Sequence, residues 1–194
     1  MISLIENPPF TRGIFFYLVL SKTLKIMKKL SAIALLLFIV IHGNAQTAAP
    51  KFETAIEYND YIVDQQTAVG VAITAYMNEV NDSLSTKESC NKQRLLSLAK
   101  VKDCRNNVKA MSGFKGDVSL RDTALLLFNF YVTTFENSYA QVLDLIFTDP
   151  FTEETKIALD KIVAELTADE AVYDSWFLNC QERFALKYGF ELTE

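Results

Sequence analysis

Residues 119–147 read SLRDTALLLFNFYVTTFENSYAQVLDLIF, and the middle of this stretch, ALLLFNFYV, is apolar on nearly every side of a helix. Such a segment is expected to be the most buried helix of its domain. Its start, Ser119 to Asp122, resembles a capping box, and Asp149 with Pro150 ends the helical pattern. The stretch therefore predicts a long central helix around which other helices pack.

Three other segments show the three-and-four spacing of apolar residues that is typical of amphipathic helices. The first covers residues 52–80, and the second ends at Gly113. The last begins at Pro150 or Thr152 and ends before Gly189. Alternating apolar runs with hairpin turns are not found, so strands have little support. The four segments predict an all-α, up-and-down four-helix bundle.

The last helix contains a second start signal. Thr167 to Glu170 reads TADE, which is itself a capping box. The helix is therefore expected either to continue through this point or to kink or split near Thr167.

The N-terminal region predicts export. Residues 27–45 form a signal peptide: Lys28 and Lys29 precede an apolar run to Ile41, and small residues lead to a cleavage point after Ala45. We therefore expect residues 1–26 to be an upstream extension from a misplaced start and residues 46–194 to form one helical-bundle domain. The predicted location is the periplasm or the cell surface of a Gram-negative bacterium.

The alternative for this region is an uncleaved membrane anchor. Four lysines separate its two apolar runs, and charged groups at bilayer depth are costly. The longer run has 12 residues, whereas a membrane span needs about 20. No cysteine stands at the cleavage point, so a lipid anchor is not expected, and no transmembrane anchor remains after cleavage.

Composition excludes several functions. Residues 46–194 contain 14 Lys and Arg and 23 Asp and Glu, a net charge of −9, so a nucleic-acid partner is not expected. The one histidine, His42, lies in the predicted signal peptide, which removes imidazole as a base or ligand. We predict no cofactor and no metal, and an enzyme only through carboxylate chemistry that leaves no motif.

Basic residues concentrate in one helix, between residues 87 and 116. One interpretation is that this helix lies between acidic neighbours and pairs with them. The other is a basic surface that meets envelope phosphates or an acidic protein. The residues of this candidate basic surface are Lys92, Arg94, Lys100, Lys102, Arg105 and Lys109.

Amides and tyrosines on apolar helix faces form a second candidate site. Asn59 and Gln66 fall in register with apolar residues of the first helix, and buried amides need hydrogen-bond partners. The group either fixes helix register as a polar layer or lines a small pocket. Its members are Asn59, Gln66, Asn129, Tyr131, Tyr139 and Gln181.

Three cysteines follow the signal peptide. Cys104 and Cys180 lie on apolar faces about two turns before the ends of their helices, and they are the better candidates for a disulfide. The alternative is that both are small buried side chains.

Two stretches, EYNDYIVDQQ at residues 57–66 and QERFALKYGFEL at residues 181–192, together with residues 114–122, resemble a family of exported helical surface proteins from Bacteroidetes and spirochaetes. The cleavage context Asn44-Ala45-Gln46 is similar to Bacteroidetes signals. The resemblance implies an envelope location and supplies no catalytic or binding residues.

The expected function is that of a non-enzymatic exported protein that acts through protein or envelope contacts. The alternative is a carrier that holds an apolar small molecule inside the bundle, against the candidate tyrosines and Trp176. A cavity in the bundle interior would favour the carrier, and a close-packed interior would exclude it.

Overall fold

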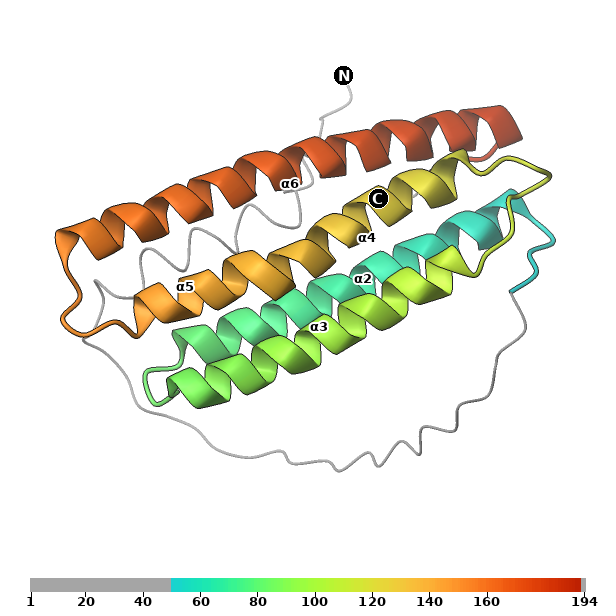
Figure 1. Ribbon diagram of the computed structural model, residues 1–194. Helices are drawn as coiled ribbons and strands as arrows, with labels where there is room; N and C mark the ends of the chain where they lie inside the picture. Colours follow the sequence, from blue (N-terminus) through green and yellow to red (C-terminus); the bar gives the residue numbers. More distant parts are fainter. Residues whose placement is uncertain (1–49, 193–194) are drawn as a thin grey trace, which may run out of the picture.

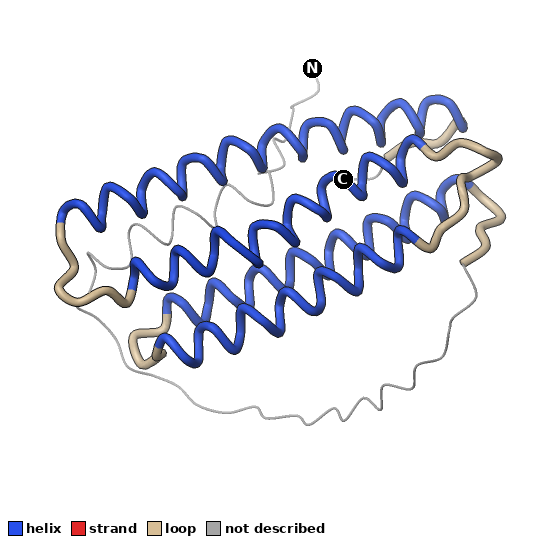
Figure 2. The backbone as a smooth tube through the Cα atoms, viewed as in Figure 1, coloured by secondary structure: helices blue, strands red, loops and turns tan. Residues whose placement is uncertain are grey.

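The computed structural model describes residues 50–192, and its helices run up and down along one common direction (Figure 1). α2 spans Ala55–Asn81, α3 spans Lys87–Lys109, and α6 spans Glu153–Tyr188. The third rod consists of α4 (Ser119–Thr133), the π-helical turn η1 (Thr134–Ser138) and α5 (Tyr139–Ile146). No strand occurs within residues 50–192 (Figure 2), and the predicted all-α four-helix bundle is confirmed.

Local side-chain chemistry sets the ends of α2 and α6. The Thr54 hydroxyl accepts a hydrogen bond from the Glu57 amide at 3.1 Å, and the Glu57 carboxylate accepts one from the Thr54 amide at 3.2 Å. Thr152 caps α6 in a similar way by accepting from the Thr155 amide. Gly189 ends α6 with a φ of 73°, a left-handed conformation that glycine adopts without a Cβ clash. The ends of α6 agree with the predicted ones, whereas α2 begins at Ala55, three residues after the predicted start at residue 52.

The two predicted capping boxes, at Ser119 and at Thr167, are not formed. α4 is preceded by Asp117, whose carboxylate accepts hydrogen bonds from the Ser119 amide at 2.9 Å and hydroxyl at 2.7 Å. In α6 the Thr167 hydroxyl donates to the Val163 carbonyl at 2.8 Å, and the Glu170 side chain is buried. α6 therefore continues through Thr167 for 36 residues without a split.

The irregular turn lies instead in the third rod, where a regular helix was predicted. The Arg94 guanidinium of α3 donates a hydrogen bond to the Phe135 carbonyl within η1. Lys102, also on α3, forms an ion pair with Glu136 at 2.6 Å. Two α3 cations therefore hold the wide turn, whose carbonyls do not follow the α-helical hydrogen-bond pattern.

The core lies along the bundle axis. α3 packs between α2 and the third rod, and α6 packs mainly on α4 and α5. Tyr76 stacks on Tyr139 with ring centroids 4.8 Å apart, and Phe135 meets Tyr139 edge-on at 4.9 Å. Phe128 is fully buried, as predicted for the central helix, but Leu126 is 49% exposed. The central helix is thus not surrounded on all sides, because the bundle covers only one face of α4.

The predicted extension (residues 1–26), the signal peptide (residues 27–45) and the alternative anchor lie outside the described residues. Within residues 50–192, no helix has the length and hydrophobicity that a membrane crossing requires.

Candidate functional site

Two members of the predicted polar layer meet in the bundle interior. The Gln181 amide of α6 donates a hydrogen bond to the Asn59 side-chain oxygen of α2 at 2.9 Å, and both residues are buried. Each amide thereby finds a partner from the opposite end of the chain. This geometry supports a role in fixing the register of α2 against α6.

The other members do not join this pair. Tyr131 is buried and its hydroxyl donates to the Glu170 carboxylate at 3.0 Å, in a separate contact between α4 and α6. Tyr139 is buried in the stack with Tyr76. Gln66 is half-buried, and Asn129 is exposed because it lies on the outer face of α4. Of the six predicted residues, Asn59 and Gln181 bond to each other, whereas Tyr131 and Tyr139 contact Glu170 and Tyr76, so the six do not form a single layer.

An interior carrier site is not supported by these positions. Trp176, one of its expected walls, is 50% exposed on the surface of α6. Three clefts that residues 50–192 line lie elsewhere: at one end of the bundle, beside the start of α3, and in the groove between α2 and α3.

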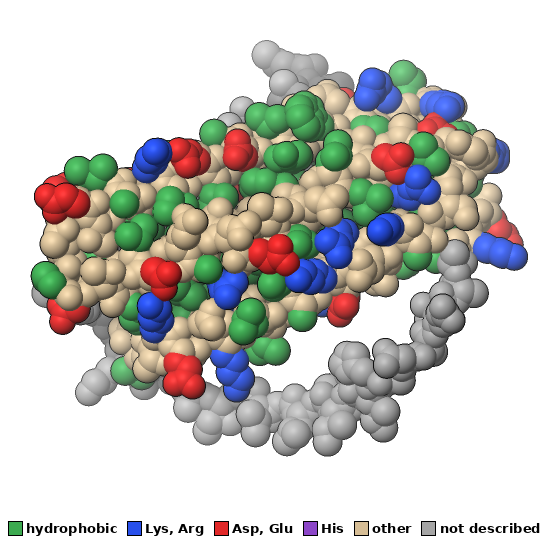
Figure 3. All heavy atoms as spheres, in the orientation of Figure 1, with side chains coloured by type: hydrophobic (Ala, Val, Ile, Leu, Met, Phe, Trp, Pro, Cys, Tyr) green, Lys and Arg blue, Asp and Glu red, His purple; other side chains and the backbone are tan. Residues whose placement is uncertain are grey.

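The predicted basic surface is divided by the fold. Arg94 is buried and bonded to Phe135, and Lys102 is paired with Glu136, so these two cations hold the third rod. On the face drawn in Figure 3, basic and acidic side chains are interspersed. This arrangement agrees with the pairing interpretation of the basic helix. The exposed or partly exposed remainder is Lys92, Lys100, Arg105 and Lys109.

The predicted disulfide between Cys104 and Cys180 is not formed. Both cysteines are buried free thiols, as is Cys90. Cys104 lies on α3 and Cys180 on α6, two helices that do not pack against each other in this bundle. The residues fill core positions, as the alternative interpretation expected.

The most unusual chemistry lies at the end of the bundle where α2 begins and α6 ends (Figure 1). Tyr58 forms ring contacts with Phe52 at 5.2 Å, Phe114 at 5.7 Å and Phe184 at 5.6 Å between centroids. Tyr188 meets Phe114 edge-on at 5.1 Å. Chain segments that are far apart in sequence therefore share one aromatic cluster. We call it the aromatic end, and it consists of Phe52, Tyr58, Phe114, Phe184 and Tyr188.

A cleft of about 380 Å³ opens beside this cluster. Its walls are residues 50–53, residues 112–115 and Tyr58, and we call it the end cleft. Its volume falls in the range of small-molecule sites, about 300–1,000 Å³.

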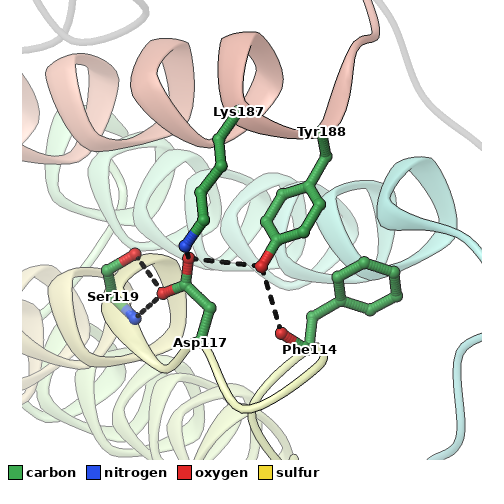
Figure 4. Close-up of polar contacts among 5 residues, drawn as sticks. All are labelled: Phe114, Asp117, Ser119, Lys187 and Tyr188. Carbon is green, nitrogen blue, oxygen red and sulfur yellow. Dashed lines mark hydrogen bonds and ion pairs between the residues drawn. The ribbon is translucent and has the colours of Figure 1, made fainter.

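Polar contacts hold one wall of the end cleft in place (Figure 4). The Lys187 ammonium donates to the Asp117 carboxylate at 2.6 Å, which ties the connection between α3 and α4 to the end of α6. The Tyr188 hydroxyl lies 3.4 Å from both that carboxylate and the Phe114 carbonyl. Hydrogen bonds from Lys187 and then Ser119 hold the pKa of Asp117 well below its ordinary value.

The Tyr58 hydroxyl has no such partner. Among the buried side-chain polar atoms of residues 50–192, it alone makes no hydrogen bond. Burial raises the pKa of Tyr58 to about 12, against a smaller opposing effect of the Arg121 charge. Native proteins rarely leave a buried hydroxyl unpaired, and such exceptions need an explanation.

Sequence analysis did not single out the aromatic end. Its tyrosines and phenylalanines belong to no site motif, and neither do Asp117 and Lys187. One signal was present, because an up-and-down bundle of four helices brings its first and last helical turns together. Aromatic residues at both ends of the domain were therefore bound to meet.

Comparison with known proteins adds no relationship: no protein-family model, curated protein or solved structure matches the chain. The resemblance of residues 57–66 and 181–192 to exported surface proteins stays a prediction. Within residues 50–192, no cluster of three or more Cys, Asp or Glu side chains is placed to hold a metal ion.

Proposed function

We propose that this is an exported, non-enzymatic helical protein of the periplasm or cell surface that acts by binding another protein. The observation that carries the proposal is an exposed apolar surface on α4 and α6. We call it the aromatic patch, and it consists of Leu126, Phe130, Val172, Tyr173 and Trp176.

The aromatic patch is ordered by ring contacts. Phe130 stacks on Tyr173 with centroids 5.0 Å apart, and Tyr173 meets Trp176 edge-on at 5.4 Å. Trp176 is 50% exposed and Val172 45% exposed. Figure 3 shows hydrophobic side chains gathered over α6 and beside α4. Exposed Trp and Tyr side chains in one apolar patch are typical of protein-binding hot spots.

The chemistry of the patch favours a protein over a membrane or a polyanion. Its five residues are uncharged, whereas residues 46–194 have a net charge of −9. Approach to an anionic surface would be opposed by that charge. A protein that offers an apolar face of its own would instead be held by burial of the aromatic rings.

An enzymatic role has less support. Among the acidic side chains that the structure describes, Glu170 has the pKa best suited to a catalytic acid or base, because burial raises its pKa to about 7. However, its side chain is enclosed between α4 and α6, is 6% exposed, and accepts a hydrogen bond from the Tyr131 hydroxyl. A substrate would have to separate two helices to reach it.

A binding experiment with matched surface variants tests the proposal. Trp176→Ser should abolish recovery of the partner from an envelope extract. Leu178→Ser, which changes a 54% exposed residue of the same helix outside the patch, should leave recovery unchanged. Equal recovery with both variants would contradict binding through the aromatic patch.

Export has its own test. N-terminal sequencing of the protein from an envelope fraction should begin at Gln46. If the chain is recovered only from the cytosol with its N-terminus uncleaved, export is contradicted. The test of binding through the aromatic patch does not depend on that result.

A small-molecule carrier remains the second candidate. The specific observation in its favour is the end cleft, which lies at the end of the bundle and not in the predicted interior site.

A further inference from the structure

The groove between α2 and α3 is an apolar face that the other described helices leave exposed. The two helices pack side by side and antiparallel (Figure 1), and the Ser97 hydroxyl of α3 donates a hydrogen bond to the Ala72 carbonyl of α2 at 2.8 Å. Beside this bond Val71 is 63% exposed and Leu96 is 57% exposed. Large apolar side chains exposed together on one face are typical of a contact surface.

Small side chains leave room inside the groove, which has a volume of about 320 Å³. Ala68, Ala72 and Ala75 line it on α2, and Val71 and Leu96 border it from the two helices. A valine or leucine that enters from outside would therefore be buried without displacing the core. The groove suits side chains of the same kind as the two that border it.

Charged residues are arranged unequally around this apolar centre. On α2, Asp64 lies two turns before Val71 on the same helix face. On α3, Lys92 lies one turn before Leu96 and Asp103 lies two turns after it, again on one face. Because the helices are antiparallel, Asp64 and Asp103 lie at one end of the centre and Lys92 lies at the other.

This arrangement of charges is complementary to itself. Asp64, Lys92 and Asp103 are exposed, and none of them forms an ion pair among residues 50–192. A two-fold rotation about an axis perpendicular to the groove brings Lys92 of a second copy to the end that holds the two acids. The same rotation brings the acids of the second copy to Lys92 of the first. One patch then serves both copies, as in the isologous interfaces of two-fold dimers.

We propose that the groove between α2 and α3 is the interface of a symmetric dimer of this chain. Val71 and Leu96 of each copy enter the groove of the other, and Lys92 of each copy pairs with Asp64 and Asp103 of the other. Apolar burial supplies the binding energy, and the charge pairs fix the relative direction of the two copies. The aromatic patch lies on α4 and α6, so the dimer does not depend on the proposed binding of another protein.

The mass of the protein in solution tests the dimer. Sedimentation equilibrium of the protein expressed from its whole sequence should give twice the mass that denaturing mass spectrometry gives for one copy. Leu96→Glu should give a monomer, because it places a charge in the apolar centre of the interface. Leu186→Glu, which changes an 84% exposed residue of α6, should stay a dimer. Both variants should keep the helical circular dichroism of the original, since both side chains are exposed.

Exchange of charges tests the two-fold arrangement. Asp64→Lys and Lys92→Glu should each weaken dimerisation about 10-fold or more, because each variant places like charges together in both halves of the interface. An equimolar mixture of the two variants should dimerise as the original does, since both charge pairs of the mixed dimer again join opposite charges. Asp169→Lys, which changes an exposed acid of α6, should leave dimerisation unchanged.

Two results would overturn the dimer. One is an original protein that stays monomeric at concentrations up to about 1 mM, and the other is a mixture that dimerises no better than its two components. If the original were a monomer and Leu96→Glu abolished its capture of a different protein, the groove would serve that protein and not a second copy.

Discussion

Glu170 should make the stability of this protein fall as pH rises. The side chain is 6% exposed and accepts a hydrogen bond from the Tyr131 hydroxyl at 3.0 Å. Asp174 follows one turn further along α6. Burial, and then the Asp174 charge, raises the pKa of Glu170 from 4.5 to about 7, and the Tyr131 hydrogen bond opposes the shift.

The sign and size of the effect follow from proton linkage. Between pH 4.5 and pH 7 the folded chain keeps the Glu170 proton, whereas the unfolded chain has lost it. The free energy of unfolding therefore decreases by about 1.4 kcal/mol per pH unit, and by roughly 3 kcal/mol across the interval. Below pH 4.5 this stabilisation is complete, and above pH 7 it is lost.

Glu170→Gln should remove this pH dependence of stability, because an amide stays neutral and its oxygen still accepts a hydrogen bond from the Tyr131 hydroxyl. Urea unfolding followed by circular dichroism from pH 4.5 to pH 8 gives the free energy of unfolding of both proteins. The variant should match the original at pH 4.5 and exceed it by up to about 3 kcal/mol at pH 8.

An exposed acid on the same helix provides the control. Glu165→Gln should change the free energy of unfolding by less than about 0.5 kcal/mol at either pH. If Glu170→Gln kept the original pH slope, or were less stable than the original protein at pH 8, the assignment of that slope to a buried carboxyl would be wrong.

Three further predictions concern contacts between helices. Asn59→Ala should cost about 1–3 kcal/mol in urea unfolding, because it leaves the Gln181 amide buried without its partner; replacing both by Leu should recover most of the loss. Arg94→Met should lower stability by about 2–3 kcal/mol, since the Phe135 carbonyl loses a charged donor, and an unchanged thermal midpoint would contradict this role. Asp117→Asn should destabilise the fold at neutral pH but converge with the original in acid, because the pKa of Asp117 is lowered in the folded state and its stabilisation is lost as pH falls below 3.8.

Periodicity and end signals were sufficient to predict most of the architecture. Thr152 and Gly189 bound α6 as expected, since a side-chain cap and a left-handed glycine are local features. The π turn at Thr134–Ser138 was not predictable, because it adds one residue per turn without changing the apolar composition. Its stabilising contacts come from α3, which local patterns in the third rod do not report.

The candidate sites show the same division between local and long-range information. Asn59 was predicted because it lies in register with apolar neighbours on its own helix, and Gln181 because it is one of the polar side chains that could serve as its partner. Asn129 was misplaced, since a helix that is apolar nearly all round does not reveal which side faces solvent. The end cleft depends on how Phe52 and Phe114 approach Tyr58 from separate connections, and no spacing within one segment encodes that approach.

The wide turn η1 also bears on how the chain can change in length. The wide turn holds one residue more than an α-helical turn, so removing one residue from Thr134–Ser138 would let α4 and α5 merge into a regular helix and leave the face bearing Tyr139 and Leu143 in the core. A change of one residue in chain length, which most helices absorb only at their ends, can thus be absorbed here in the middle of a helix. A deletion elsewhere in α4 or α5 would instead rotate the face on one side of it by about 100°.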